Sequence, residues 1–337
     1  MWRRALRQRW LKLGPRIVVV GGGTGLSVLL RGLKEYTANL TALVTVTDDG
    51  GSSGRLRDEL GVLPPGDIRN CLVALADTET LMEQVLGYRF QQGAGLQGHT
   101  LGNLLLASLT EVTGSFVSAI QEVSRILRVR GQVLPATLSQ QVLCAELRDG
   151  TLVEGETRIT REGSPGIQRV FLRPGDPLPV EATLAALQAA DAIVLGPGSL
   201  YTSVIPNLLV KGIAETIRSS RAVKIYVCNV MTQPGETSNY SAADHLQAIY
   251  DHCGSRLVNY ILVNNQEIRR QHLRRYQEKG AQQVRVDSKR LQQLGVTVIG
   301  APLLLQGELI RHDPRLLARQ VLELGQRRKR IEHQQLF

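Results

Sequence analysis

Apolar residues along this chain alternate between short continuous runs and helical spacing. Residues 16–20 form a β-branched run that stops at three glycines, and the leucines of residues 25–33 then recur at helical spacing. A second run, Leu40–Thr47, is rich in valine and threonine, which is typical of a strand. A strand, a glycine loop, a helix and another strand in this order predict a parallel, doubly wound sheet.

The same alternation continues toward the C-terminus, with a different pattern in the middle. Residues 142–148 and 151–155 flank an Asp-Gly turn and predict a β-hairpin, Ile167–Leu172 predicts another strand, and three prolines follow within residues 174–179. Further helices are predicted at Ile68–Ala76, Thr80–Tyr88, Leu101–Thr110, Phe116–Leu127, Glu181–Ala190, Leu208–Ile217, Ala242–His252, Ile268–Lys279 and Pro314–Gln326, and further strands at Ala192–Leu195, Val223–Cys228, Leu257–Val263 and Val296–Ile299.

These elements predict one α/β domain over residues 16–326, with a Rossmann-like, doubly wound and mostly parallel sheet. The hairpin and its neighbours form a small β insertion at about residues 131–180. Residues 1–15 and 327–337 lie outside this domain, as a basic N-terminal segment and a basic C-terminal tail.

The net charge of +10 comes from the two ends of the chain. Residues 1–16 carry six cations and no acid, and residues 327–330 carry four more, so the rest is nearly balanced. A nucleic-acid-binding protein would place such charge on its folded face, and aromatic residues that could stack on bases are scarce. No apolar run is long enough to span a membrane. The N-terminal stripe of Trp2, Leu6, Trp10 and Leu13 is either a frayed terminus or a helix that weakly touches anionic lipid.

The four cysteines are widely scattered and form no C-x-x-C pair, so their spacing indicates neither a zinc knuckle nor a redox pair. Isolated cysteines in a chain of this length are typical of the reducing cytoplasm, and we expect a cytoplasmic protein. Cys71 and Cys228 stand in apolar runs and are expected to pack in the core.

Two glycine-rich loops follow predicted strands. Gly21–Gly25 stands between a strand and a helix, where backbone N–H groups and the helix N-terminus suit a phosphate. Gly196–Ser199 follows the strand Ala192–Leu195 and should reach the same edge of the sheet. Neither loop is a G-x-G-x-x-G fingerprint, a P-loop or a G-x-S-x-G elbow. The alternative interpretation of the first loop is a tight turn that binds nothing.

The polar loop Asp48–Gly54 comes directly after the second strand. The adjacent carboxylates of Asp48 and Asp49 could bind ribose hydroxyls or a divalent cation. Arg55 and Arg57 could bind negatively charged groups of a ligand. The alternative is a flexible loop in which Asp48 caps a helix.

Three more polar segments stand at predicted element ends. In Pro64–Asn70, Asp67 has the position of a helix N-cap, and the next residues could meet a ligand. In Gly98–Asn103 a helix start offers N–H groups, whereas His99 is more typical of a structural hydrogen-bonding residue. Asn229–Thr237 carries amides and hydroxyls of the kind that read a base edge or sugar hydroxyls.

In order along the chain, these segments resemble the motifs of the YvcK family of gluconeogenesis factors. They are G-G-G-T-G-L-S at 21–27, D-D-G-G-S-S-G-R-L-R at 48–57, P-G-D-I-R-N at 65–70, G-H-x-L-G-N at 98–103, G-P-G-S-L-Y-T-S at 196–203 and N-V-M-T-Q-P-G-E-T at 229–237. The family is similar in fold to CofD, the 2-phospho-L-lactate transferase, but CofD-like enzymes lack the S-S-G-R-L-R continuation. The resemblance implies a cytoplasmic protein that binds UDP-sugars such as UDP-N-acetylglucosamine and serves cell shape and cell-wall supply during gluconeogenic growth.

Two functions remain open at this point. The leading hypothesis is a UDP-sugar-binding regulatory protein, because no residue stands out as a nucleophile or an activated general base. In this hypothesis the two glycine loops hold the diphosphate, the paired aspartates face the ribose or a cation, and the 229–237 segment reads the uracil or sugar. The alternative is a CofD-like transferase that uses Mg²⁺, held by Asp48 and Asp49, against a nucleotide diphosphate substrate. A homo-oligomer is also open.

The candidate ligand-binding residues are Gly22, Gly23, Thr24, Gly25, Asp48, Asp49, Ser52, Ser53, Arg55, Asp67, Arg69, Asn70, Asn103, Gly196, Gly198, Ser199, Tyr201, Asn229, Thr232 and Gln233.

Overall fold

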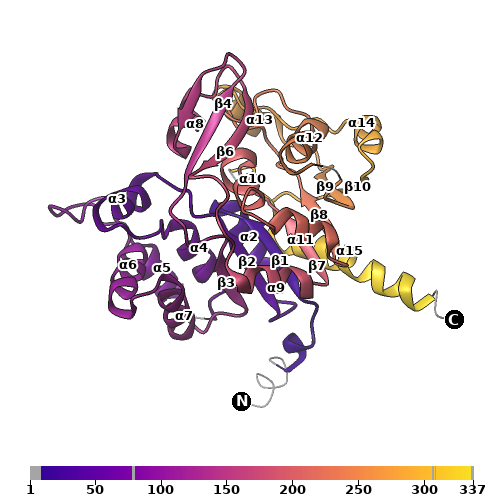
Figure 1. Cartoon of the computed structure of the whole chain (residues 1–337). Helices are drawn as coiled ribbons and strands as arrows, with labels where there is room; N and C mark the ends of the chain where they lie inside the picture. The colour runs from indigo at the N-terminus through magenta and orange to yellow at the C-terminus, as the bar shows by residue number, and fades with distance from the viewer. Residues whose placement is uncertain (1–8, 78–79, 255, 306, 308, 335–337) are drawn as a thin grey trace.

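The computed structural model describes residues 9–77, 80–254, 256–305, 307 and 309–334. Its centre is a seven-stranded, all-parallel sheet, which confirms the predicted doubly wound α/β fold (Figure 1). All five residues of β1 (Ile17–Gly21) are buried, as expected of a parallel strand with helices on both faces. In spatial order the strands are β10 (Thr297–Ala301), β9 (Tyr260–Asn264), β8 (Val223–Val227), β7 (Ala192–Leu195), β1 (Ile17–Gly21), β2 (Leu40–Val44) and β3 (Gln132–Pro135).

Helices cover both faces of the sheet and form two separate apolar cores. One face carries α2 (Gly23–Leu33), α4 (Gly66–Leu75), α6 (Leu101–Thr113), α7 (Phe116–Ile126) and α15 (Pro314–Gln334). The other face carries α9 (Glu181–Ala189), α10 (Ile205–Leu208), α11 (Ile213–Ser219), α12 (Ala242–Cys253) and α14 (Ser288–Gln293). The helices α3 (Gly51–Leu60) and α5 (Thr80–Gly87) pack on α6, and α13 (Arg270–Gln277) follows β9.

The insertion is a three-stranded antiparallel sheet with one helix, at the top of the view in Figure 1. The predicted hairpin and third strand are confirmed by the order β5-β4-β6, in which both pairs are antiparallel. Within the predicted range 131–180, β3 belongs to the main sheet, because it pairs with β2. The small sheet consists of β4 (Val142–Leu147), β5 (Leu152–Glu154) and β6 (Ile167–Arg173). Helix α8 (Glu156–Glu162) connects β5 to β6 and packs on β4 and β5.

Three local predictions were wrong. The expected loop Asp48–Gly54 enters helix α3 at Gly51, because Ser52, Ser53 and Gly54 are buried against neighbouring elements despite their low helix propensity. The expected helix Leu208–Ile217 is two helices, separated where Gly212 adopts a φ of +81°. The last helix extends to Gln334, through residues expected to form a tail.

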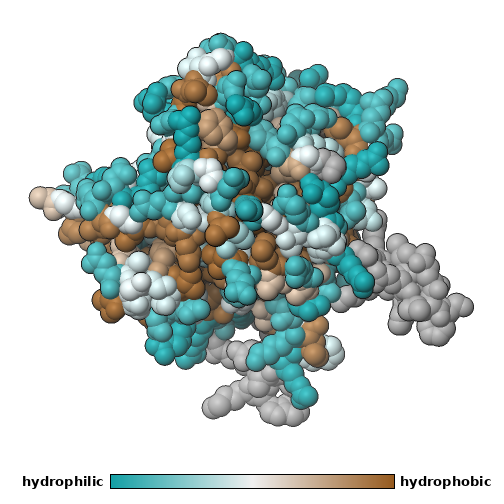
Figure 2. Space-filling model, in the orientation of Figure 1, coloured by the Kyte–Doolittle hydropathy of each residue, from teal (hydrophilic) through white to brown (hydrophobic). Residues whose placement is uncertain are grey.

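The surface carries apolar side chains over one helical region. Figure 2 shows apolar surface around α5 and α6, and the exposed residues of these helices include Leu81, Val85 and Val112. Surfaces of this kind are often covered by partners, and whether the protein forms a homo-oligomer stays open. In the described part of the chain, no helix combines the length and the apolar character needed to cross a bilayer.

The strand order reverses at the centre of the sheet. From β1 the chain continues to β2 and β3 on one side, and it later continues from β7 to β10 on the other. The loops after β1 and β7 therefore diverge at a topological switch point. In open α/β sheets this crevice, at the carboxyl ends of the strands, is where ligands bind.

Candidate functional site

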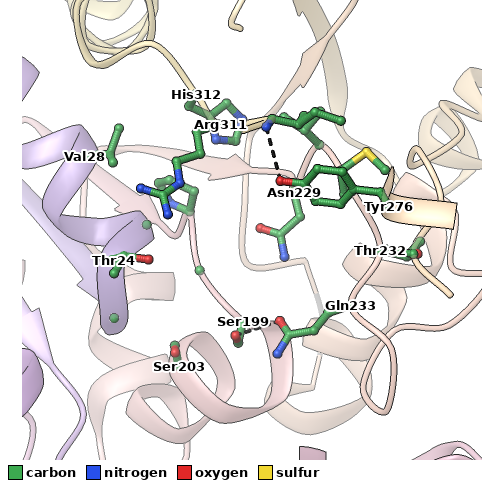
Figure 3. A pocket seen from close by; sticks show the side chains of 18 of the residues that line it. Thr24, Val28, Ser199, Ser203, Asn229, Thr232, Gln233, Tyr276, Arg311 and His312 are labelled. Atoms are coloured by element: carbon green, nitrogen blue, oxygen red, sulfur yellow. Dashed lines mark hydrogen bonds between the residues drawn. The ribbon is translucent and has the colours of Figure 1, made fainter. Parts of the chain in front are cut away.

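A cavity of about 500 Å³ lies at this switch point. One wall consists of the glycine loop at the start of α2, and the next consists of the Pro197–Ser199 turn after β7. The third wall is the loop Asn229–Pro234 after β8. The fourth comes from α13, the turn after it and the segment before α15, which supply Tyr276, Lys279, Ile310, Arg311 and His312 (Figure 3).

The two glycine loops lie backbone against backbone. A Cβ atom on Gly25 would stand 2.6 Å from the carbonyl oxygen of Pro197, so a side chain there would separate the loops. Gly23 adopts a φ of +65°, a left-handed conformation that favours glycine. Helix α2 begins here without a side-chain cap. The Gly23 N–H donates to the Asp67 carboxylate behind the loop, whereas Thr24 and Gly25 of the first turn line the cavity. The positive end of the helix dipole there suits a phosphate.

The cavity wall carries cations but no described carboxylate. Lys279 and Arg311 line it, and none of the described lining residues is Asp or Glu. Figure 3 shows Arg311 extended toward Thr24 and Val28 of α2. Burial lowers the pKa of His312 to about 4, so its imidazole is neutral near pH 7. The charged side chains that line the cavity are therefore positive, which favours an anionic ligand.

Helix α13 and the segment before α15 are fixed to one another. The backbone N–H of Ile310 donates to the hydroxyl of Tyr276 over 3.2 Å, the contact dashed in Figure 3. Leu273 and Ile310 also pack on a small apolar cluster with Val230 and Leu304, separate from the two main cores. This cluster positions Lys279 and Arg311 opposite the glycine loops.

The structure brings together the predicted residues of three segments. Those that line the cavity are Gly22, Gly23, Thr24, Gly25, Gly198, Ser199, Asn229, Thr232 and Gln233. Within this set, the Ser199 hydroxyl donates to the Gln233 side-chain oxygen over 2.8 Å. The Thr232 hydroxyl accepts from the backbone N–H of Gln282 over 2.8 Å. Their role in binding stays a prediction.

Most other predicted residues form a polar cluster behind the glycine loop. Asp67 accepts a hydrogen bond from the backbone N–H of Gly23, and burial, followed by the charge of Asp48, raises its pKa to about 6. A Cβ on Gly22 would stand 2.4 Å from an Asp67 carboxylate oxygen, so the cluster touches the rear of the glycine loop. The remaining members are joined in pairs: Arg69 donates to Asn70, Asn103 donates to Ser52, and the Gly66 N–H donates to Ser53.

The two aspartates of the polar loop diverge. Asp48 accepts from the backbone N–H of Gly50 over 2.9 Å, whereas Asp49 accepts from both the N–H and the hydroxyl of Thr157 on α8. Among the described residues, no group of three His, Cys, Asp or Glu side chains could hold a metal ion. Asp48 and Asp49 thus face different neighbours, and their role toward Mg²⁺ stays a prediction.

Three predicted residues face elsewhere. Arg55 donates to the carbonyl oxygen of Gln97 at the protein surface. Gly196 lies behind the turn that lines the cavity. Tyr201 is only 2% exposed, and its hydroxyl bonds to that of Tyr240 over 2.8 Å. Tyr201 is therefore a core residue.

Sequence reasoning missed the fourth wall. Tyr276, Lys279 and Arg311 belong to a basic helix and a loop with no glycine-rich motif, so their residue pattern resembles an ordinary solvated surface. The signal that could have found them is topological: they follow β9 and β10, whose carboxyl ends meet the same sheet edge.

Comparisons with known proteins agree with this architecture. The family model described as 2-phospho-L-lactate transferase CofD matches residues 17–304. The chain is 53% identical over 308 residues to the gluconeogenesis factor of Halalkalibacterium halodurans, covering 91% of this chain and 95% of that protein. It is 49% identical over 311 residues to the gluconeogenesis factor of Bacillus subtilis, covering 92% and 98% of the two chains.

A solved structure shows the same fold. The crystal structure of a UPF0052 family member from Bacillus halodurans superposes with a TM-score of 0.89 at 52% identity, covering 92% of this chain and 99% of that one. The chain therefore belongs to the CofD family and, within it, to the gluconeogenesis factors of the YvcK type.

Proposed function

We propose that this protein is a regulatory protein that binds a UDP-sugar, with UDP-N-acetylglucosamine as the first candidate, and serves cell shape and cell-wall supply during gluconeogenic growth. The observation that carries the proposal is the cavity at the switch point. It joins two glycine loops, the N-terminus of α2 and two cations, with no described carboxylate among its lining residues. A cavity of about 500 Å³ is within the usual range for a small-molecule ligand.

The chemistry of each cavity wall suits a different part of the proposed ligand. The diphosphate would lie at the α2 N-terminus between the glycine loops, where Arg311 can reach it. The uracil and sugar would extend along the loop after β8, where Asn229 offers an amide and Gln233 holds the Ser199 hydroxyl. The names of the relatives support a role in gluconeogenic metabolism rather than a particular reaction.

Calorimetric titration tests the proposal. UDP-N-acetylglucosamine, UDP-glucose, GDP and NAD are titrated into the protein, and we expect the UDP-sugars to bind more tightly than the other nucleotides. Arg311→Ala should weaken UDP-sugar binding about tenfold or more, because a charge-assisted hydrogen bond is worth roughly 1.5–3 kcal/mol. Arg315→Ala is the matched control, because Arg315 is exposed on α15 and does not line the cavity.

Binding without preference for a uridine nucleotide would contradict the proposal. The same samples, incubated with Mg²⁺ and followed by phosphorus NMR, test the alternative function. Consumption of the nucleotide sugar would show a transferase, as in the CofD enzymes that name the family model.

A further inference from the structure

Glu236 is a buried carboxylate that lies behind the cavity wall without lining it. Its side chain is part of a residue that is 2% exposed. It accepts hydrogen bonds from four donors on three elements, so its burial is compensated. The donors are the Gln233 amide at 2.7 Å, the Thr202 hydroxyl at 3.1 Å, the backbone N–H of Tyr201 at 3.3 Å and the Thr160 hydroxyl at 3.3 Å.

This carboxylate fixes the direction of a hydrogen-bond chain that ends in the cavity. Burial raises the pKa of Glu236 to about 7, so at about pH 8 the carboxylate is mainly ionised and only accepts hydrogen bonds. Gln233 then turns its NH₂ group toward Glu236. The Gln233 carbonyl oxygen then faces Ser199 and accepts the hydroxyl proton over 2.8 Å. Ser199 has one proton to donate, and Gln233 receives it. The Ser199 oxygen is left with lone pairs for the cavity.

A phosphate oxygen is a poor partner for such a group, because both are acceptors. The neighbouring turn and the α2 N-terminus already offer backbone N–H groups to a diphosphate. A hydroxyl or amide N–H of the ligand, in contrast, can donate to Ser199. The sequence-based expectation that Ser199 holds the diphosphate is therefore not what this chain of hydrogen bonds favours.

We propose that Glu236 is a positioning residue that, through Gln233, makes Ser199 an acceptor for a donor group on the sugar of the bound nucleotide sugar. This inference rests on the proposed function. Glu236 also holds the first turn of the π-helix Leu200–Val204, which follows Ser199 directly, so the same carboxylate sets both the place and the polarity of the Ser199 hydroxyl.

The test compares two ligands at pH 8: UDP-N-acetylglucosamine and UDP, which lacks the sugar. Ser199→Ala should weaken the nucleotide sugar about three- to tenfold, the usual worth of one neutral hydrogen bond, and leave UDP nearly unchanged. Glu236→Gln should cause the same selective loss. Its oxygen can satisfy the Tyr201 N–H while its NH₂ faces Gln233, which reverses the Gln233 amide and frees the Ser199 proton.

The double variant and two controls make the inference specific. If the three residues act as one chain, Glu236→Gln should add nothing in a Ser199→Ala background. Thr160→Val removes the donor that leads to the insertion rather than to the cavity, and it should affect both ligands equally or not at all. Should Glu236→Gln not fold, Gln233→Met interrupts the same chain at the surface of the cavity and carries the same prediction.

Equal loss for both ligands in Glu236→Gln and Gln233→Met, or losses that add in the double variant, would reduce Glu236 to a structural role and overturn the inference. If the unmodified protein binds UDP and not the nucleotide sugar, both this inference and the proposed function fail. If it binds both ligands and only the selectivity pattern is absent, the inference alone fails.

Discussion

At the scale of single residues, Gly23 gives the most direct test of the proposed phosphate binding by the glycine loop. A Cβ there meets no atom closer than the Ser203 hydroxyl at 3.9 Å, so the site has room for a methyl group. The φ of +65° nevertheless costs a residue with a side chain about 1 kcal/mol or more. Gly23→Ala should therefore lower the melting temperature slightly. It should also weaken UDP-sugar binding about tenfold, because the methyl group enters the space expected for the phosphate.

Free uridine provides the control for Gly23→Ala, because it has no diphosphate. Calorimetry on the folded fraction should show nearly unchanged uridine binding. Equal weakening of uridine and of the UDP-sugar would mean that the loop does not contact phosphate.

Asp67 should make stability depend on pH. Burial, followed by the charge of Asp48, raises its pKa from 3.8 to about 6 in the folded protein. The folded state therefore holds a proton between these values that the unfolded state has lost. The resulting stability is fully present below pH 4 and is lost as the pH rises through 6.

Asp67→Asn removes this pH dependence, because an amide does not titrate. The variant should keep the local structure, because the amide oxygen can still accept from the Gly23 N–H. The unfolding free energy of Asp67→Asn, relative to the unmodified protein, should increase between pH 4.5 and pH 7.5 in urea titrations. Asp58→Asn, at an exposed carboxylate on α3, serves as the control and should show a flat difference. A flat difference for Asp67→Asn as well would remove Asp67 as the responsible group.

The residues that could be predicted from sequence are those whose chemistry is backbone chemistry. Glycines directly after a strand predict the loops at Gly22–Gly25 and Gly198, and both loops line one cavity in the structure. The direction of a side chain is a tertiary property. Asp49 follows a strand as Asp48 does, yet Thr157 of the insertion binds it, and nothing local to residues 48–54 encodes that contact.

At the scale of elements, strong periodicity was sufficient and polar composition was misleading. The leucine-rich helix α6 and the hairpin β4–β5 stand where the sequence predicts them. Helix α3 was missed because its sequence is rich in glycine, serine and charge. Its formation depends on buried tertiary contacts, such as the Ser53 hydroxyl accepting from the Gly66 N–H.

The N-terminal segment allows an element-scale prediction. Trp2 and Leu6 of the expected stripe lie outside the described residues, but Trp10 is 73% and Leu13 77% exposed. If this stripe contacts lipid, the protein should sediment with vesicles containing anionic phospholipid at low salt and be released at high salt. Changing both Trp10 and Leu13 to Ser should abolish sedimentation without changing nucleotide binding.

Leu152→Ser is the control for that experiment, because Leu152 is also exposed but belongs to the insertion. Its sedimentation should equal that of the unmodified protein. Absence of sedimentation in the unmodified protein at low salt would leave the frayed-terminus interpretation alone.

At the scale of the whole molecule, the insertion supports the cavity without reaching it. Helix α8 contributes Thr157 to Asp49 and Thr160 to Glu236, so it contacts loops on both sides of the switch point. At the C-terminal end of α8, the backbone of Gly163 packs directly against the backbone of the loop after β8. A Cβ on Gly163 would lie 1.8 Å from the carbonyl oxygen of Gly235. The insertion thus supports the loop that carries Gln233 and Glu236 from behind.

If the insertion supports this loop, a substitution in the insertion that touches no ligand should still weaken ligand binding. Gly163 has a φ of −69°, so alanine there causes no backbone strain, and its effect must come from the contact with Gly235. Gly163→Ala should lower the unfolding free energy by about 1–3 kcal/mol through overpacking. It should also reduce UDP-sugar affinity about tenfold, because the displaced loop carries the Gln233 amide. Gly175→Ala, in the linker after β6, has nothing within 4 Å and should change neither quantity. Thermal unfolding and calorimetry measure both effects, and full affinity in a destabilised Gly163→Ala protein would show that the insertion moves while the cavity wall stays in place.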